Sequence, residues 1–238
     1  MARRCRCSST RSENEAVADY DLSNNGTLVF VPGGPRRRQN RIVWAGAGRA
    51  DDVLSLPERE YESVVVSPDG RRAVAQVLDG TVGLWMLDLE RRALTPFLAN
   101  GSSRQAPVWT ADGQRVIYRR TLNGFRNLYM KNADGTGDET RITEKAGVVH
   151  SPTSVSRDGR WLVFSEGGGP SGAAQWLVRI DAAASETERV PKRFPMEESA
   201  NNGQISPDGK WLAYQSEVSG NQEVYVRPRS TSCRPIAR

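Results

Sequence analysis

A four-residue motif recurs along the chain at nearly constant intervals, and it constrains the fold more than any other feature. Ser67-Pro68-Asp69-Gly70 is repeated identically at Ser206-Pro207-Asp208-Gly209, and close variants lie at Thr110-Ala111-Asp112-Gly113 and Ser156-Arg157-Asp158-Gly159. Ser23-Asn24-Asn25-Gly26 is a weaker fifth copy. Such quartets favour type I turns, in which the first side chain bonds the backbone and the final glycine supplies a positive φ. Because a β-type run follows each copy, the motif predicts five antiparallel hairpins.

The spacing of the motif indicates four short strands in each repeat. Its glycine recurs at positions 26, 70, 113, 159 and 209, in steps of 44, 43, 46 and 50 residues. An aromatic residue follows the turn glycine by 15 to 17 residues in four units, at Trp85, Tyr129, Trp176 and Tyr225. A period of ~40–50 residues with four strands is the signature of a β-propeller. A sandwich would need no self-similarity, and the β-branched and aromatic runs exclude a solenoid of helical pairs.

The strands expected from this period divide the chain into five units after an aperiodic lead. We expect a disordered lead over 1–15, units of about 16–57, 58–100, 101–146, 147–195 and 196–228, and an irregular tail over 229–238. The predicted strands are 17–22, 27–31, 41–44 and 52–56; 63–66, 72–78, 82–88 and 93–97; 106–109, 115–118, 127–131 and 140–143; 153–155, 161–165, 175–180 and 187–190; and 203–205, 211–215 and 223–227. The fifth unit therefore lacks a fourth strand.

Composition narrows the range of partners. The net charge is +5, but 29 of the 33 basic residues are arginines spread along the 238-residue chain rather than gathered in one patch. The densest cluster, Arg36-Arg37-Arg38 with Arg41, is interpreted as a solvated loop rather than a phosphate site. We therefore expect no nucleic-acid partner. No run approaches the ~18 apolar residues of a membrane span, and the basic start lacks the apolar core of a signal peptide. A periplasmic and a cytoplasmic location both stay open.

Neither a metal site nor a catalytic constellation is expected. Cys5, Cys7 and Cys233 lie outside the repeats, and with one histidine in the chain they are far from a zinc set. Gly169-Pro170-Ser171-Gly172 lacks the setting and spacing of a nucleophile elbow. His150 precedes this serine and is interpreted as a loop or blade-edge residue. No phosphate-binding loop or kinase catalytic loop is present. We predict no enzyme activity, no catalytic residue and no cofactor.

Three recurring residue sets have both a structural and a functional interpretation. The tryptophans at repeat-equivalent positions are predicted to pack between blades, with a stacking platform as the alternative; they are Trp85, Trp109, Trp161, Trp176 and Trp211. The turn aspartates are predicted to cap the backbone rather than to form a ligand ring. Residues 134–139 have a calcium-like composition without the alternating ligands of a calcium loop, so a turn between third and fourth strands is expected.

The residues also resemble a known repeat family. Residues 206–214 and 127–135 resemble the WD40-like β-propeller repeat of TolB and its relatives, and the resemblance covers roughly residues 20–228. Residues 202–214 and 223–228 are similar to propellers attached to bacterial serine/threonine protein kinases, as is 28–34. Relatives of this kind generally have six or more blades. The resemblance thus implies an incomplete propeller, a fragment whose covalent neighbour domain is missing.

The function implied is that of a non-enzymatic binding module, such as the sensor part of a kinase. It would recognise a protein or small ligand on a propeller face or in the central channel. The alternatives are an accessory domain of a prolyl-oligopeptidase-like serine peptidase and a remnant without function. No pattern identifies the binding residues. A search would begin in loops 32–40, 98–105 and 166–174, because the blades differ mainly in these loops and binding residues are often in loops. An unclosed propeller is expected to be oligomeric or poorly soluble.

Overall fold

The computed structural model describes eight segments of the chain, and these carry the fold. They are residues 19–22, 28–31, 41–45, 52–79, 81–99, 103–169, 172–195 and 199–229. The three cysteines, the weak turn copy at 23–27, the loop 32–40 with its arginine cluster and Ser171 lie outside them. Within these segments, no helix has the length and apolarity needed to cross a bilayer.

The described strands form five antiparallel groups, named blades 1 to 5, and a parallel pairing of Arg126 with Val149 joins blades 3 and 4 into one eight-stranded sheet. Blade 1 contains β1 (Asp19–Leu22), β2 (Leu28–Val31), β3 (Val43–Ala45) and β4 (Asp52–Val53). Blade 2 contains β5 (Tyr61–Val66), β6 (Arg72–Asp79), β7 (Thr81–Asp88) and β8 (Ala93–Leu98). Blade 3 contains β9 (Arg104–Trp109), β10 (Arg115–Leu122), β11 (Phe125–Asn132) and β12 (Thr140–Arg141). Blade 4 contains β13 (Val149–Val155), β14 (Trp161–Gly169), β15 (Gly172–Arg179) and β16 (Lys192–Arg193), and blade 5 contains β17 (Ala200–Ile205), β18 (Trp211–Ser216) and β19 (Glu223–Pro228).

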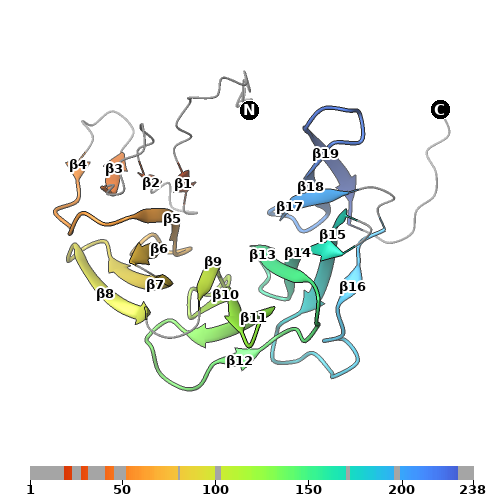
Figure 1. Ribbon diagram of the computed structural model, residues 1–238, viewed down its shortest axis with the longest axis horizontal. Helices are drawn as coiled ribbons and strands as arrows, with labels where there is room; N and C mark the ends of the chain where they lie inside the picture. The colour runs from red at the N-terminus through yellow and green to blue at the C-terminus, as the bar shows by residue number, and fades with distance from the viewer. Residues whose placement is uncertain are drawn as a thin grey trace.

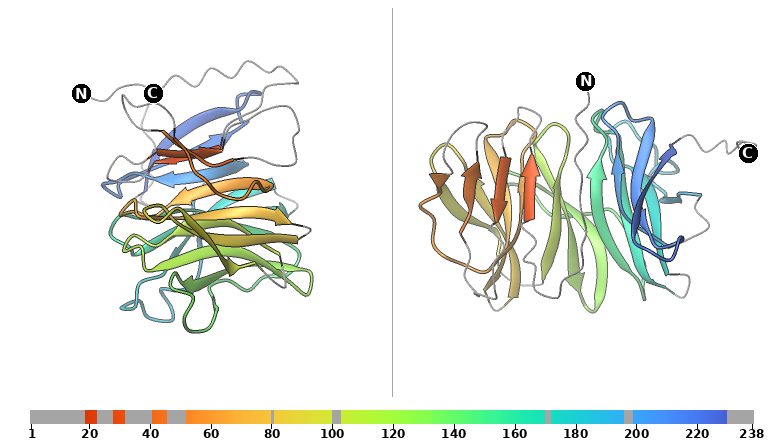
Figure 2. Two further views of the ribbon diagram at one scale, coloured as in Figure 1. Left: turned by 90° about the vertical axis from the view of Figure 1, so that its left-hand side faces the viewer. Right: turned by 90° about the horizontal axis from the view of Figure 1, so that it is seen from above.

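The blades follow one another around an arc, with the first strand of each blade innermost (Figure 1). Contacts link β1 to β5, β5 to β9, β9 to β13 and β13 to β17, so these strands form the inner wall. Successive sheets pack face to face (Figure 2). The sheets do not close into a ring, and the arc is open between blades 1 and 5 (Figure 1). The predicted fold class, an all-β propeller that is incomplete, is confirmed.

The core consists of apolar layers between neighbouring blades rather than one central cluster. Along β6, Ala73, Ala75 and Val77 pack in the layer with blade 1, whereas Val74 packs in the layer with blade 3. Strand residues alternate between the two faces of a sheet, so a strand covered on both faces is apolar at successive positions. Trp109 is buried in the layer between blades 2 and 3, and its indole N–H donates to the Val65 carbonyl oxygen at 3.0 Å.

The four described copies of the turn motif share one hydrogen-bond pattern. In the first, the Gly70 amide donates to the Ser67 carbonyl at 2.8 Å, and Gly70 has φ of 69°. The Ser67 hydroxyl donates to Asp69 Oδ1 and accepts from the Arg72 amide. The Arg71 amide also donates to Asp69 Oδ1. The predicted type I turn and the backbone-capping role of its aspartate are confirmed.

Irregularities in the inner strands were not predicted from the sequence. The β-ladder shifts register after Tyr61, Pro152 and Asn201 and also within β9, where Ala106 has φ of 51°. Such bulges bend a strand and increase its twist. In blade 5 the Gly203 amide donates to the Gln175 side-chain oxygen of blade 4 at 3.1 Å. The Gln175 side chain lies so close to Gly203 that a Cβ on this glycine would be 2.3 Å from Gln175 Oε1.

The fourth strand predicted for blade 4 at 187–190 is wrong, because this segment forms a turn. The Glu188 carboxylate accepts hydrogen bonds from both the amide and the hydroxyl of Ser185. The Arg189 amide donates to the Ser185 carbonyl at 3.1 Å. These local bonds compete with a strand, so pairing with β15 begins only at β16 and continues with the Phe194 amide bonding the Gln175 carbonyl.

Candidate functional site

A cleft lies at each of three successive blade junctions, on the edge of the arc that carries the four turns. The cleft between blades 2 and 3 has a volume of about 450 Å³ and that between blades 3 and 4 about 390 Å³. The cleft between blades 4 and 5, called the 4/5 cleft, is the largest at about 580 Å³. Volumes of this order accommodate small ligands or a few side chains of a partner.

One main-chain hydrogen bond recurs within each of blades 2 to 5, beside the turn. The residue that follows the third strand of a blade donates its amide to the carbonyl of the residue that follows the turn glycine. The four pairs, written donor first, are Leu89 with Arg71, Ala133 with Gln114, Ile180 with Arg160, and Arg229 with Lys210, at 2.7–3.0 Å. The donor side chain is apolar and buried in blades 2 to 4. In blade 5 it is an arginine, and its guanidinium reaches back to donate to the Gly209 carbonyl at 2.6 Å.

The lining of the 4/5 cleft combines apolar and cationic side chains. Its apolar members are Trp161, Leu177, Trp211 and Pro228, and its cationic members are Lys192, Arg193, Lys210 and Arg229. None of the residues that line this cleft is acidic. By contrast, Asp134 lines the cleft between blades 2 and 3, and three aspartates, Asp112, Asp158 and Asp181, line the cleft between blades 3 and 4.

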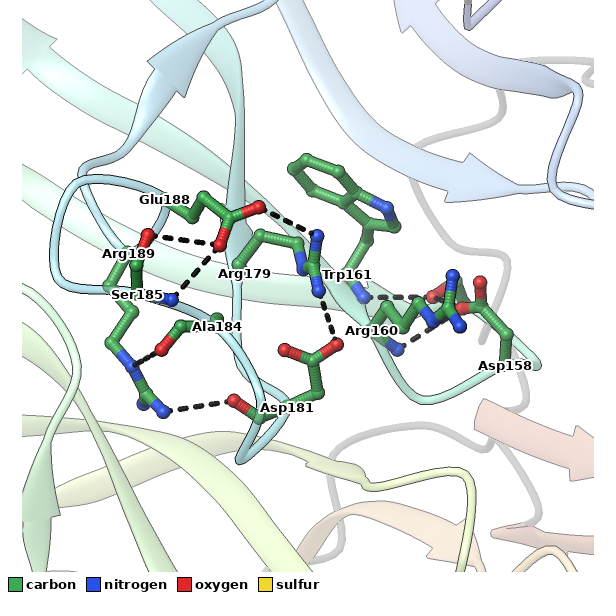
Figure 3. Close-up of polar contacts among 10 residues, drawn as sticks. Asp158, Arg160, Trp161, Arg179, Asp181, Ala184, Ser185, Glu188 and Arg189 are labelled. Atoms are coloured by element: carbon green, nitrogen blue, oxygen red, sulfur yellow. Dashed lines mark hydrogen bonds and ion pairs between the residues drawn. The ribbon is translucent and has the colours of Figure 1, made fainter.

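Trp161 is held in place by a network behind the cleft. The Arg179 guanidinium lies 5.4 Å from the indole ring centroid and donates to Asp181 at 2.6 Å and to Glu188 at 3.2 Å. Figure 3 shows Arg179 between these two carboxylates and beside Trp161. The hydrogen bond to Asp181 raises the pKa of Arg179 above its usual value. The Arg229 guanidinium lies 5.4 Å from the same ring. Cations that contact the indole favour a fixed ring orientation.

The cationic side chains of the cleft have few local counter-charges. Lys192 and Arg193 are exposed on β16, and no carboxylate lies within ion-pair distance of either one in the described segments. Lys210 is 4.0 Å from Asp208. Asp208 is itself engaged in the turn, where hydrogen bonds from the Ser206 hydroxyl and the Lys210 amide lower its pKa. A positive potential therefore extends over an apolar floor.

His150 does not lie in a loop; it is buried on β13, the inner edge strand of blade 4, so the blade-edge alternative is confirmed. It lies on the inner strand β13 with 3% of its surface exposed. One ring nitrogen is 2.8 Å from the Thr143 hydroxyl and the other is 3.0 Å from the Glu166 carboxylate. Burial lowers the pKa of the imidazole. Burial alternates along β13, and His150 shares the buried face with Pro152 and Ser154, whereas Val149 and Val155 are half-buried, so no apolar alternation in the sequence marks this face.

The predicted packing of the tryptophans is confirmed in part. Trp109 is buried between blades, and Trp176 stacks on Phe164 with ring centroids 6.3 Å apart. The interpretation is wrong for Trp211, because 46% of that residue is exposed. Residues 134–139 connect β11 to β12 as predicted, and the Thr136 amide donates to Asp134 at 2.8 Å.

The sequence did not identify the 4/5 cleft. The cleft is lined by residues from two units, and these residues lie up to 68 positions apart in the sequence, from Trp161 to Arg229. The signal that could have found it is the arginine at a position where the other units have Leu89, Ala133 and Ile180. The described residues include no group of three or more histidine, cysteine or acidic side chains arranged to hold a metal ion.

The five blades and their arrangement around an open arc define an open β-propeller domain. TolB from Acinetobacter baumannii superposes with a TM-score of 0.68 at 15% identity, over 92% of this chain and 53% of that chain. A putative TolB from Agrobacterium tumefaciens gives 0.67 at 17% identity, over 90% and 80%. The propeller domain of the Trilobed protease from Pyrococcus furiosus, described as having an open velcro topology, gives 0.65 at 13% identity, over 93% and 71%. At these identities the likeness concerns the fold alone.

Sequence comparison adds one curated relative. The uncharacterized protein Atu1656 of Agrobacterium fabrum is 30% identical over 132 residues, which are 53% of this chain and 39% of that protein. The match thus spans about two fifths of the relative's length. No protein-family model matches the chain.

Proposed function

We propose that this chain is a binding module whose 4/5 cleft receives an acidic peptide segment that also carries an apolar side chain. The observation that carries the proposal is the lining of the cleft, with four cationic and four apolar side chains and no acidic one. An anionic ligand gains charge-assisted hydrogen bonds from lysine and arginine. An apolar side chain of the ligand gains burial against Trp161, Leu177 and Pro228.

The positions of the cations favour a ligand with more than one carboxylate. Lys192 and Arg193 are neighbours on β16 of blade 4, whereas Lys210 and Arg229 belong to blade 5. A ligand that reached both sets would cross the junction between the blades. A peptide with acidic residues on both sides of an apolar one has this form, and it belongs to the protein partners expected for a propeller face.

Fluorescence anisotropy with a labelled peptide of alternating glutamate and leucine tests the proposal. The double substitution Lys192→Glu with Arg193→Glu should weaken binding by about tenfold or more, since reversed charges now face the ligand. Both side chains are exposed, so folding should be preserved. A glutamine and leucine peptide should bind no more than weakly, and added salt should weaken binding of the acidic peptide.

The matched control is the double substitution Arg71→Glu with Arg91→Glu. Both arginines are exposed on blade 2, and the change in net charge is the same. This control should bind the acidic peptide as the unchanged chain does. Equal weakening in both double variants would mean that net charge, not the cleft, governs binding. Absence of binding to the unchanged chain would overturn the proposed function.

Two wider roles stay proposals beside this one. A sensor role in a bacterial serine/threonine kinase is supported by the resemblance of residues 202–214 and 223–228 to kinase-attached propellers. An accessory role in a serine peptidase is supported by the fold likeness to a prolyl endopeptidase, with a TM-score of 0.64 at 15% identity over 34% of that chain. The coding sequence on either side of this chain decides between them, through a kinase domain upstream or an α/β-hydrolase domain downstream.

A further inference from the structure

A second cationic site lies at the inner wall, away from the 4/5 cleft. Arg119 is on β10, in register with Gln105 of the inner strand β9. Its guanidinium donates to the Ser151 hydroxyl of the inner strand β13 at 2.7 Å and to the Gln105 side-chain oxygen. The side chain therefore joins the inner strands of blades 3 and 4. Gln105 and Ser151 lie in the halves of their strands that are farther from the turns, and Arg119 lies in the middle of β10.

Arg119 lacks the counter-ion that two neighbouring arginines of the same blade possess. Arg104 and Arg120 both form ion pairs with Glu139. Within the described segments, no carboxylate lies within ion-pair distance of Arg119, whose two partners are neutral. Its Nε–H is buried without an acceptor. Burial first, and then the charge of Arg126, lower the pKa of Arg119.

A charge held by neutral partners is oriented but not neutralised. A guanidinium has five N–H donors in a fixed planar fork. Gln105 and Ser151 engage one hydrogen on each terminal nitrogen and leave a second on each. Because the side chain is only partly buried, a ligand can approach those terminal nitrogens from solvent. Pairing with an anion would also offset the cost of an unpaired, partly desolvated charge.

We propose that Arg119 anchors a carboxylate-binding site between the inner strands of blades 3 and 4, with Gln105 and Ser151 as positioning residues. The flat fork of arginine matches a planar carboxylate with two parallel hydrogen bonds. Arg126, exposed at the start of β11, adds positive charge nearby. The carboxylate comes either from a free organic acid or from a peptide side chain. The proposal is independent of the 4/5 cleft, since the two sites share no residue.

Calorimetric titration with three probes at constant ionic strength tests the site. Succinate represents a free acid, acetylated and amidated aspartate represents a peptide carboxylate, and inorganic phosphate represents a tetrahedral anion. At least one carboxylate probe should bind the unchanged chain. Arg119→Met should weaken that binding about tenfold or more, because charge-assisted hydrogen bonds are lost. Tighter binding of phosphate than of both carboxylates would overturn the assignment, as would absence of carboxylate binding.

Three further variants separate binding from folding. Arg119→Lys keeps the charge without the fork and should also weaken binding about tenfold. Ser151→Ala keeps Arg119 but removes one positioning bond, and about three- to tenfold weakening is expected. Arg141→Met removes an exposed arginine that pairs with Glu144 on the same blade, and it should leave binding unchanged. If Arg119→Lys and Arg119→Met bind a carboxylate as tightly as the unchanged chain, the site is overturned.

Discussion

The cleft between blades 3 and 4 and the 4/5 cleft are built on the same main-chain frame, yet they differ in charge. Both have a Ser-x-Asp-Gly turn at their edge, and in both the residue after the third strand donates its amide to the carbonyl that follows the turn glycine. In blade 4 that residue is Ile180, which is 5% exposed and packs in the core. In blade 5 it is Arg229, which lines the cleft. A repeated frame therefore fixes the backbone, while the side chain at this position is one of those that give the two clefts different chemistry.

The largest expected effect comes from placing an arginine at the same position in blade 4, where Ile180 is buried. Ile180→Arg should lower the free energy of unfolding by about 3–5 kcal/mol, because an unpaired charge would be buried among Leu128, Met130 and Val178. Denaturant titration measures the loss. Ile180→Leu should cost less than about 1.5 kcal/mol. If Ile180→Arg lowered the free energy of unfolding no more than Ile180→Leu, blade 4 would accept an arginine at this position as blade 5 does, which would contradict the prediction.

The second prediction concerns the contact between Gly203 of blade 5 and Gln175 of blade 4. Gly203→Ala should destabilise the chain by about 1–3 kcal/mol, because the added methyl would meet Gln175 Oε1 at 2.3 Å and Val163 at 3.0 Å. Gly167→Ala is the matched control, since its Cβ would meet no atom within 4 Å. Denaturant titration of both variants compares them directly. Equal stability would mean that blade 5 can shift relative to blade 4.

A smaller effect is expected when blade 5 is given the side chain of the other blades. Arg229→Leu should weaken binding of the acidic peptide by about tenfold, roughly 1.4 kcal/mol, while the free energy of unfolding stays the same or rises. Anisotropy and denaturant titration measure the two quantities separately. Unchanged affinity would leave Arg229 with a structural role only, through its contacts with Gly209 and Trp161.

The smallest expected effect is on the pH dependence of the free energy of unfolding, to which His150 of blade 4 and Asp208 of blade 5 contribute in different pH ranges. Burial lowers the pKa of His150 from 6.5, so its neutral form stabilises the fold and that contribution is lost as the pH falls below about 6.5. His150→Gln should flatten the decline between about pH 6.5 and 5. Asp208 also has a lowered pKa, so its contribution is lost only below its usual 3.8. Denaturant midpoints measured across this pH range provide the check.

The repeat pattern predicted the architecture well because it reflects local geometry. A turn glycine at positive φ and an aspartate that accepts the amide two residues later act within four residues, as Gly159 and Asp158 show. The β-type runs likewise predicted nearly every strand. The strand predicted at 187–190 was wrong because the Ser185 and Glu188 side chains stabilise a turn there. Their hydrogen bonds depend on side-chain orientation, which the sequence does not show.

The sites could not be predicted in the same way, because they join distant positions. In the 4/5 cleft, Lys192 of blade 4 and Arg229 of blade 5 line the same space. At the inner wall, Arg119 of blade 3 donates a hydrogen bond to Ser151 of blade 4. Neither pair has a characteristic spacing. The burial of His150 could not be read from the sequence either, because its neighbours on the buried face of β13 are Pro152 and Ser154, while the valines of this strand are half-buried.

The hydrogen bond made by the residue after the third strand has an evolutionary consequence. It uses only main-chain atoms, so leucine, alanine, isoleucine and arginine satisfy it equally well at Leu89, Ala133, Ile180 and Arg229. Selection can therefore act on this side chain in one blade without altering the main-chain hydrogen bond that blades 2 to 5 share. Duplicated blades of this kind can diversify in what they recognise through single substitutions, while the ancestral scaffold persists.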